Sequence, residues 1–344
     1  MNTLVLSIGR GFRKTDNAIL AVLLLILAIA FGLPHEDALE SFRFTSSSLL
    51  GISPFLIASA LMAAYLTAAG ADKVIGRVFS GHGLKVISAA ALFGSLSPFC
   101  SCGVIPIIAA LLAAGVPLPA VMAFWLSSPI MDPEMFVLTV GGLGFEFAVA
   151  KTIAAFAIGI FGGLATRAVI KAGGFTSPLK DDVSGCGTCK PKIADEQPLW
   201  AFWKEARRKA TFNTDFFSTL YFLGKWLALA FILESLMVMY LPAETVAEWL
   251  GNDSTFAIPL AVITGVPAYM NGYAAIPLVS GLMETGMAPG PALAFMTAGA
   301  VTSIPAAIAV FALVNRPVFL WYLLLAAVGS LAVGQAFQIY MQMV

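Results

Sequence analysis

Apolar runs of about 20 residues, the length that a helix needs to cross a bilayer, set the strongest constraint on this chain. They lie at 18–33, 46–70, 86–114, 118–140, 145–168, 216–241, 256–284, 288–314 and 318–342. None of them alternates polar and apolar residues in the way that the strands of a membrane barrel do. The sequence therefore predicts an all-α polytopic membrane protein.

Composition excludes the soluble and enzymatic alternatives. Apolar residues make up 59% of the chain and charged residues 11%, whereas a soluble domain carries about 25% charged residues. The net charge is zero, which gives no reason to expect nucleic-acid binding. The sequence contains no His-Glu-x-x-His motif, nucleophile elbow or P-loop, so it indicates neither a hydrolytic enzyme nor an ATP-driven pump. We expect no cofactor, and the lipid bilayer and a small solute as partners.

The distribution of charge predicts the orientation in a bacterial-type inner (plasma) membrane. Arg10, Arg13 and Lys14 precede the first apolar run, and the segment 171–215 is rich in lysine and arginine. The positive-inside rule places both segments in the cytoplasm. A cleaved signal peptide is the alternative interpretation of 18–33, but the residues that follow it lack the usual small-residue cleavage motif. We therefore expect a retained span with an outer loop after it.

An internal repeat divides the chain. A shift of 171 residues places Gly94 on Gly265 and Ile105-Pro106 on Ile276-Pro277 without a gap. The expected domains are an N-terminal segment with one span and an outer loop, a first transmembrane repeat, a cytoplasmic linker and a second transmembrane repeat, at 1–45, 46–170, 171–215 and 216–344. The segment 72–85 is basic whereas its counterpart 243–256 is acidic, which predicts inverted topology. Coincidence between two short segments is the alternative.

Counting the crossings predicts a re-entrant segment in each repeat. Residues 86–170 contain three apolar runs, yet they must begin and end on the cytoplasmic side, so one run does not cross. The run 86–114 is interrupted at 97–103 and the run 118–140 at 127–134. We expect each repeat to contain one re-entrant hairpin and one broken helix. Which of the two runs is re-entrant stays open.

The interruptions are candidates for a transport site. The second half repeats them at 268–273 and 297–305. Irregular backbone at bilayer depth is tolerated only inside protein or beside a wet cavity, and paired interruptions are typical of transporter sites near the midplane. Proline and glycine kinks that serve only packing are the alternative. We expect the four interrupted segments to converge.

The first interruption, at 97–103, contains two thiols. Cys100 and Cys102 flank Ser101 beside Gly103. Thiolates bind Cu(I), Zn²⁺ and similarly soft centres, a class that includes trivalent arsenic. Cysteines in membranes are often inert small apolar residues, which is the alternative. The spacing favours a soft-ligand site, with Cys100 and Cys102 as the candidate solute or metal ligands.

The tract Ser97-Pro-Phe-Cys-Ser-Cys-Gly-Val-Ile-Pro106, with the later Gly265-Val-Pro-Ala-Tyr-Met-Asn-Gly-Tyr-Ala-Ala-Ile-Pro277, resembles the permease family that contains organoarsenical efflux proteins (ArsP-like). The resemblance covers most of both hydrophobic halves but neither the central loop nor the first span. It implies export of trivalent organoarsenicals, with Cys100 and Cys102 in contact with the solute. Family members are also associated with copper or zinc export, so the resemblance leaves the solute open.

Further candidates surround this tract. The substrate-binding candidates are Ser97, Ser101, Ser128, Asn271 and Tyr273. Asp132 and Glu134 are the acidic pair within an apolar run and are proton-coupling candidates, although Asp-Pro-Glu is also a typical helix N-terminus. Cys186 and Cys189 have Cys-x-x-Cys spacing in the linker, which suits capture of a metal or arsenical, or two incidental thiols.

The leading hypothesis is an efflux permease for a thiophilic solute, most specifically trivalent organoarsenicals, driven by proton exchange. A copper or zinc exporter on the same scaffold is the first alternative. A membrane thiol–disulfide electron conduit is the second, but Asn271 and Tyr273 stand in the second half where the first half has Cys100 and Cys102. By analogy with folds in which a transport unit slides against a fixed scaffold, we expect a homodimer.

Overall fold

The computed structural model is nearly all helical. It describes residues 17–32, 34–70, 83–97, 101–113, 115–175, 178–179, 199, 201–240, 256–268, 272–284 and 286–343. Within these residues, β structure is limited to one antiparallel bridge between Leu179 and Val314. The expected all-α fold class is therefore confirmed for the part of the chain that is described.

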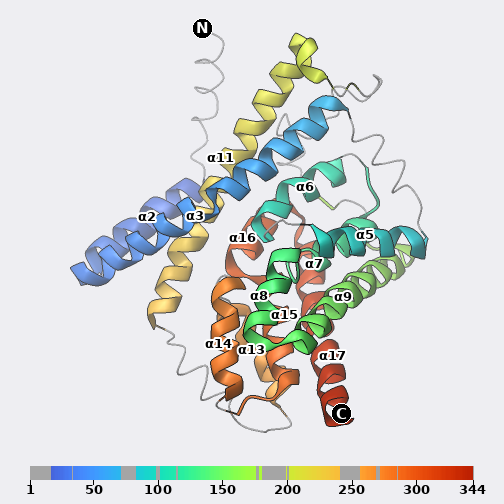
Figure 1. Ribbon diagram of the computed structural model, residues 1–344. Coiled ribbons are helices and arrows are strands. Elements are labelled where there is room, and N and C mark those ends of the chain that lie inside the picture. Colours follow the sequence, from blue (N-terminus) through green and yellow to red (C-terminus); the bar gives the residue numbers. More distant parts are fainter. Residues whose placement is uncertain are drawn as a thin grey trace.

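Figure 1 shows the described helices, coloured in chain order. The first half contains α2 (Asn17–Gly32), α3 (His35–Ala69), α5 (Leu84–Leu96), α6 (Ser101–Ala113), α7 (Leu118–Ser127), α8 (Pro133–Leu143) and α9 (Phe145–Lys171). The second half contains the short 3₁₀ helix η1 (Phe202–Lys204), α11 (Ala206–Tyr240), α13 (Ala257–Ala268), α14 (Gly272–Glu284), α15 (Pro289–Thr302), α16 (Ile304–Leu313) and α17 (Arg316–Met343).

Several helices are long and apolar enough to cross a membrane. Among the described residues, three qualify alone: α9, the part of α11 from Ala206 to Leu233, and α17. The number rises to five if two bent pairs each count as one span, namely His35–Pro54 with Leu56–Ala69 (42°) and Pro289–Thr302 with Ala306–Leu313 (43°). The remaining apolar helices are short because prolines, glycines and serines interrupt them where the sequence predicts. The chain is built as an integral membrane protein.

Three helix boundaries differ from those of the loop, linker and interruption expected from the sequence. The outer loop expected before residue 46 is helical from His35, because Pro34 stands at the N-cap and Glu36 and Asp37 in the first turn favour a helix N-terminus. The last ten residues of the expected linker likewise belong to α11, which begins at Ala206. The interruption expected at 297–305 is confined to Ser303, because Thr297 stays in the helix and donates a hydrogen bond to the Leu293 carbonyl at 2.8 Å.

Helix starts repeat along the chain with the 171-residue shift. His35 and Ala206 begin α3 and α11, Ser101 and Gly272 begin α6 and α14, and the pairs α7/α15, α8/α16 and α9/α17 begin with the same spacing. Among the described helices, α13 begins two residues later than the start of α5 predicts, and α2 and η1 have no counterpart. From α3 and α11 onward the two halves therefore carry the same succession of described helices.

The first long helices of the two halves lie side by side and antiparallel (Figure 1). At one end, Ser41 Oγ of α3 lies 2.6 Å from Ser235 Oγ of α11. At the other end, the Arg208 guanidinium of α11 donates to the carbonyl oxygens of Ala68 and Ala69 at 3.2 Å each. With α2, these helices form an arm beside the body of the molecule.

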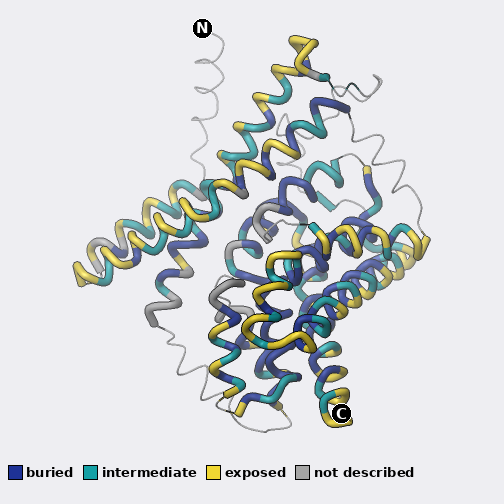
Figure 2. Tube along the Cα trace, in the orientation of Figure 1, coloured by how far each residue is buried: buried dark blue, intermediate teal, exposed yellow. Residues whose placement is uncertain are grey.

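The body is organised around α7 and α15, which are equivalent helices in the two halves. Every residue of α15 from Gly290 to Thr302 is buried, and so is all of α7 except Phe124. α9 and α17 pack against them from outside, and α5 and α13 complete each half. Figure 2 shows this concentration of buried residues in the body and the more exposed arm. Two short apolar helices are thus enclosed by protein.

Glycine permits the close approach on which this packing depends. A Cβ atom at Gly94 of α5 would lie 2.7 Å from the Phe124 carbonyl oxygen of α7. A Cβ atom at Gly265 of α13 would lie at the same 2.7 Å from the Phe295 carbonyl oxygen of α15. Gly94 and Gly265 are related by the 171-residue shift, and so are Phe124 and Phe295. The same backbone contact is therefore made twice.

We predict that Gly94→Ala and Gly265→Ala each destabilise the protein, by about 1–3 kcal/mol, because the added methyl group must displace a neighbouring helix backbone. Gly224→Ala in α11 is the matched control, since a Cβ atom there meets nothing within 4 Å. Alanine is the better helix former by about 1 kcal/mol, so this control should be neutral or stabilising. Thermal unfolding in detergent measures all three. Equal melting temperatures for Gly94→Ala and Gly224→Ala would contradict the packing argument.

Candidate functional site

The first two interruptions meet through their serines. Ser97 ends α5 and Ser128 ends α7, and their hydroxyl oxygens are 2.9 Å apart. Ser97 Oγ also donates to the Gly94 carbonyl at 2.8 Å. Because a serine has one hydroxyl proton, Ser128 is then the donor to Ser97. The close approach at Gly94 brings together two predicted site residues that are 31 positions apart in the sequence.

Asp132 is the N-cap of α8. Its Oδ1 accepts a hydrogen bond from the Met135 amide at 2.7 Å, its backbone is extended, and Pro133 follows at the first helical position. This satisfies one of the amides that a helix N-terminus leaves without a partner. Glu134 lies in the first turn of α8 and is exposed. Of these two predicted residues, only Asp132 faces the interior of the body.

Lys151 is a buried ionisable residue that the sequence analysis did not single out. It lies on α9 and is 1% exposed, and α9 packs against α8, whose N-cap is Asp132. The signal was present in the sequence, since a lysine within the apolar run 145–168 is a functional candidate by default. The sequence analysis considered acidic and sulfur-containing residues instead.

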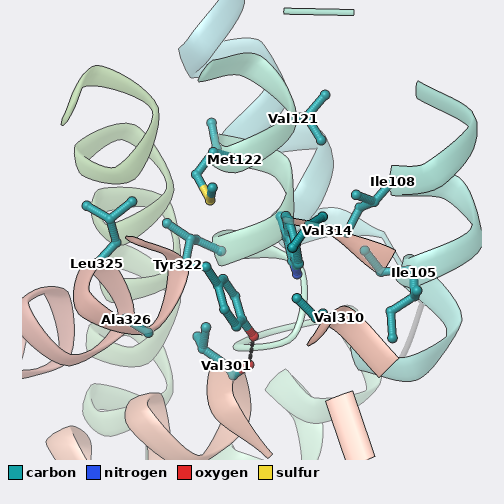
Figure 3. Close-up of a cluster of buried hydrophobic side chains, with 14 of the residues drawn as sticks. Ile105, Ile108, Val121, Met122, Val301, Val310, Val314, Tyr322, Leu325 and Ala326 are labelled. Carbon is teal, nitrogen blue, oxygen red and sulfur yellow. Dashed lines mark hydrogen bonds between the residues drawn. The ribbon is translucent and has the colours of Figure 1, made fainter. Parts of the chain in front are cut away.

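Tyr322 of α17 occupies the position equivalent to Lys151 under the 171-residue shift. Figure 3 shows its ring in the apolar cluster and its hydroxyl directed at Val301. The ring stacks on Trp125 with centroids 4.8 Å apart, and the hydroxyl donates to the Val301 carbonyl. Pro305 has no amide hydrogen, so this carbonyl lacks its usual helical partner four residues later. Tyr322 therefore satisfies the backbone group that the interruption at Ser303 frees.

The short helices of each half pack against the other half. Ser280 of α14 donates to the Gly142 carbonyl of α8 at 3.3 Å. In the equivalent contact, Ile105 and Ile108 of α6 join Val310 and Val314, at the end of α16, in one apolar cluster (Figure 3). The helices that follow the first interruption, α6 and α14, thus each contact the other half as well as helices of their own half. This arrangement brings elements of both halves to one region of the body.

The remaining predicted residues are placed only in part. Cys100, Asn271, Cys186 and Cys189 lie outside the described residues. Ser101 and Cys102 begin α6 and Tyr273 lies in the first turn of α14, but their side chains are also outside the described part. Among the described side chains, no group of three or more His, Cys, Asp or Glu residues could hold a metal ion. Positions 102 and 273 thus occupy equivalent places at two helix N-termini.

Comparison with known proteins identifies the family. Residues 38–339 match the ArsP_1 family model, described as a predicted permease. UPF0718 protein MJ0584 of Methanocaldococcus jannaschii is 22% identical over 327 residues, which are 80% of this chain and 90% of that protein. UPF0718 protein YcgR of Bacillus subtilis is 32% identical over 103 residues, which are 30% of this chain and 35% of that protein. No solved structure matches.

The family match confirms the resemblance found in the sequence, and it agrees with the apolar helices in indicating a membrane transporter rather than an enzyme. Because the matched residues span both halves and nearly all of the described helices, this chain belongs to the ArsP_1 family of predicted permeases.

Proposed function

We propose that this permease exports a soft, thiophilic solute, specifically trivalent organoarsenicals, in exchange for protons. The observation that carries the proposal is the Cys100-Ser101-Cys102 tract at the interruption between α5 and α6. The other side of that interruption is Ser97, whose hydroxyl meets Ser128 at the end of α7. Sulfur ligands beside hydroxyl groups suit a trivalent arsenical whose arsenic atom binds sulfur and also carries hydroxyl groups.

A metal exporter is the second candidate, and the same two thiols favour it. Cu(I) is bound well by two thiolates, whereas Zn²⁺ normally needs four ligands. The Cys100-Ser101-Cys102 tract supplies two thiolates, so it matches Cu(I) more closely than Zn²⁺, and Cu(I) is the metal to compare with the arsenical.

We predict that Cys100→Ser and Cys102→Ser each reduce export to background, because a serine oxygen does not replace a soft sulfur ligand. Uptake of methylarsenite, phenylarsenite, arsenite, Cu(I) and Zn²⁺ into everted vesicles measures the effect. Ser47→Ala, at an exposed position of α3 in the arm, is the control and should retain transport. Full transport by the double serine variant would refute the soft-ligand mechanism, and transport of Cu(I) alone would replace the arsenical.

The linker thiols are proposed to capture the solute before transport. We predict that the Cys186→Ser/Cys189→Ser double variant raises the apparent KM and leaves the maximal rate nearly unchanged, because capture precedes translocation. Transport rates measured over a range of methylarsenite concentrations test this. A double variant as inactive as Cys100→Ser would instead place the linker pair in the transport site.

We propose that the two halves have inverted topology, with the N-terminus and the linker in the cytoplasm. Two observations support this. The equivalent helices α3 and α11 are antiparallel, as their end-to-end contacts require. The first turns of these helices also have opposite charge: Glu36 and Asp37 in α3 correspond to Arg207 and Arg208 in α11. Basic residues favour the cytoplasmic side, so the start of α11 would lie inside and that of α3 outside.

Single cysteines at equivalent helix starts test this topology. We predict that His35→Cys is labelled from outside and Ala206→Cys from the cytoplasm, in a background without other cysteines, since both positions are exposed first residues of equivalent helices. Phe145→Cys and Arg316→Cys, the starts of α9 and α17, form a second pair and should behave in the same way. An impermeant maleimide applied to intact cells and to everted vesicles gives the measurement. Labelling of both members of a pair from one side would exclude the inverted repeat.

The same proposal gives the arm and the body different roles. The arm of α2, α3 and α11 would be the fixed scaffold, and the body would carry the interruptions across the membrane. Contacts of α3 with α6 and of α11 with α16 are where the two parts meet. A homodimer joined through the arm would anchor the scaffold.

A further inference from the structure

Lys151 is a cation inside the body of the molecule. It lies on α9 and is 1% exposed. Within the described part of the chain, its ammonium group makes no hydrogen bond and no direct ion pair. An isolated buried charge is costly, so an unpaired ammonium retained at this depth needs a counter-charge or a function.

Among the described residues of α9, of the helices packed against it and of their caps, Asp132 is the one acidic residue that is not exposed. The helices packed against α9 are α5, α7, α8, α15 and α17, and neither α7 nor α15 carries an ionisable residue. Those on the other helices and on α9 itself are exposed, engaged elsewhere or near the helix ends: Lys85, Glu134, Glu146, Arg167, Lys171, Arg316, Tyr322 and Tyr340. The Asp132 carboxylate, at the N-terminus of the packed α8, is therefore the counter-charge that the packing offers to Lys151. Its Oδ1 caps α8, which leaves Oδ2 as the oxygen at which a proton can bind.

The second half shows that the fold does not require these charges. Under the 171-residue shift, Tyr322 corresponds to Lys151 and Ser303 corresponds to Asp132. Both second-half residues are buried, Ser303 is the N-cap of α16, and Tyr322 donates to the Val301 carbonyl two residues before it. A neutral pair therefore completes this corner of the fold in one half, and an ionisable pair occupies it in the other. Packing alone does not explain the difference.

We propose that Lys151 and Asp132 form a one-proton coupling site in the first half of the permease. The step is a proton transfer: Asp132 Oδ2 accepts a proton from water on one side, the carboxylate becomes a neutral carboxylic acid, and Lys151 is left as an uncompensated ammonium. Release of the proton on the other side restores the neutral pair. An uncompensated cation favours a conformation in which the site meets water, so proton binding biases the conformational equilibrium of the body. This inference rests on the proposed proton-exchange function and adds the residue pair that performs it.

The chain supplies its own matched variants. Asp132→Ser and Lys151→Tyr each introduce the residue that the second half has at that position. Serine is a good N-cap, so Asp132→Ser keeps the cap of α8 while it removes the carboxylate. Asp132→Ser leaves the buried Lys151 ammonium without its partner, and Lys151→Tyr does the same to the half-buried Asp132 carboxylate, so each should lower the melting temperature in detergent. The double variant has no charge at either position and should recover the wild-type melting temperature. If Asp132→Ser fails to fold, Asp132→Asn replaces it, because asparagine is nearly isosteric with aspartate and is also a good N-cap.

Proton coupling separates the proposal from a merely structural ion pair. We expect the double variant to fold and to carry methylarsenite down its gradient, but to lose at least tenfold of the accumulation that an imposed pH gradient drives in vesicles. Lys85→Gln removes an exposed cation from the neighbouring α5 and should keep wild-type accumulation. A double variant that retains wild-type pH-driven accumulation would overturn the proposal and leave the pair structural.

A measurement without any solute keeps this inference distinct from the choice of substrate. Infrared difference spectra of the purified protein between low and high pH should show a carboxylic-acid band that disappears in Asp132→Ser and shifts in Lys151→Tyr. If no arsenical or metal is transported but this band is present, the proposed function fails while the proton site stands. If the band is absent from the wild-type protein, the proton site fails whatever the permease transports.

Discussion

A helix that is interrupted inside a membrane must find new partners for the backbone groups that the interruption frees, and lipid offers none. The structure meets this constraint with side-chain hydroxyl and carboxylate groups at each described interruption. Ser97 Oγ accepts the contact from Ser128 and donates to the Gly94 carbonyl, and Asp132 accepts from the Met135 amide. α7 and α15, each of which ends at an interruption, are the helices most enclosed by protein.

Proline is the recurrent cause of these free carbonyls. Pro54 lies at the 42° bend of α3, and the carbonyl four residues earlier, that of Leu50, accepts from Ser53 Oγ at 2.8 Å instead. Pro305 similarly frees the Val301 carbonyl, which accepts from the Tyr322 hydroxyl. A hydroxyl group close by is sufficient at the exposed bend of α3. At the buried interruption the hydroxyl comes from a different helix, α17, and so ties the interruption to the packing of the body.

Much of this arrangement could be predicted from the sequence because backbone-breaking residues are local signals. Glycine, proline and serine clusters placed the interruptions at Ser97, Ser128 and Ala268 within a few residues, and the alignment of Gly94 with Gly265 gave the spacing at which helices later proved to repeat. The beginning of α3 was missed because acidic residues in a first turn resemble a solvated loop when only hydropathy is considered. Lys151 was missed because its importance depends on a helix, α8, that the sequence does not place beside it. The roles of Cys100 and Cys102 stay predictions.

The two halves share their geometry but not their chemistry. Positions 100, 102, 132 and 151 are cysteine, cysteine, aspartate and lysine in the first half, and asparagine, tyrosine, serine and tyrosine at the equivalent positions of the second. One close packing contact is made alike in both halves, at Gly94 and Gly265. A single solute and a single proton require only one set of reactive groups. Loss of these thiols and charges from the second half is therefore what a duplicated scaffold with one working site would produce, because charges and thiols kept in both halves would add the cost of burial without a second function to offset it.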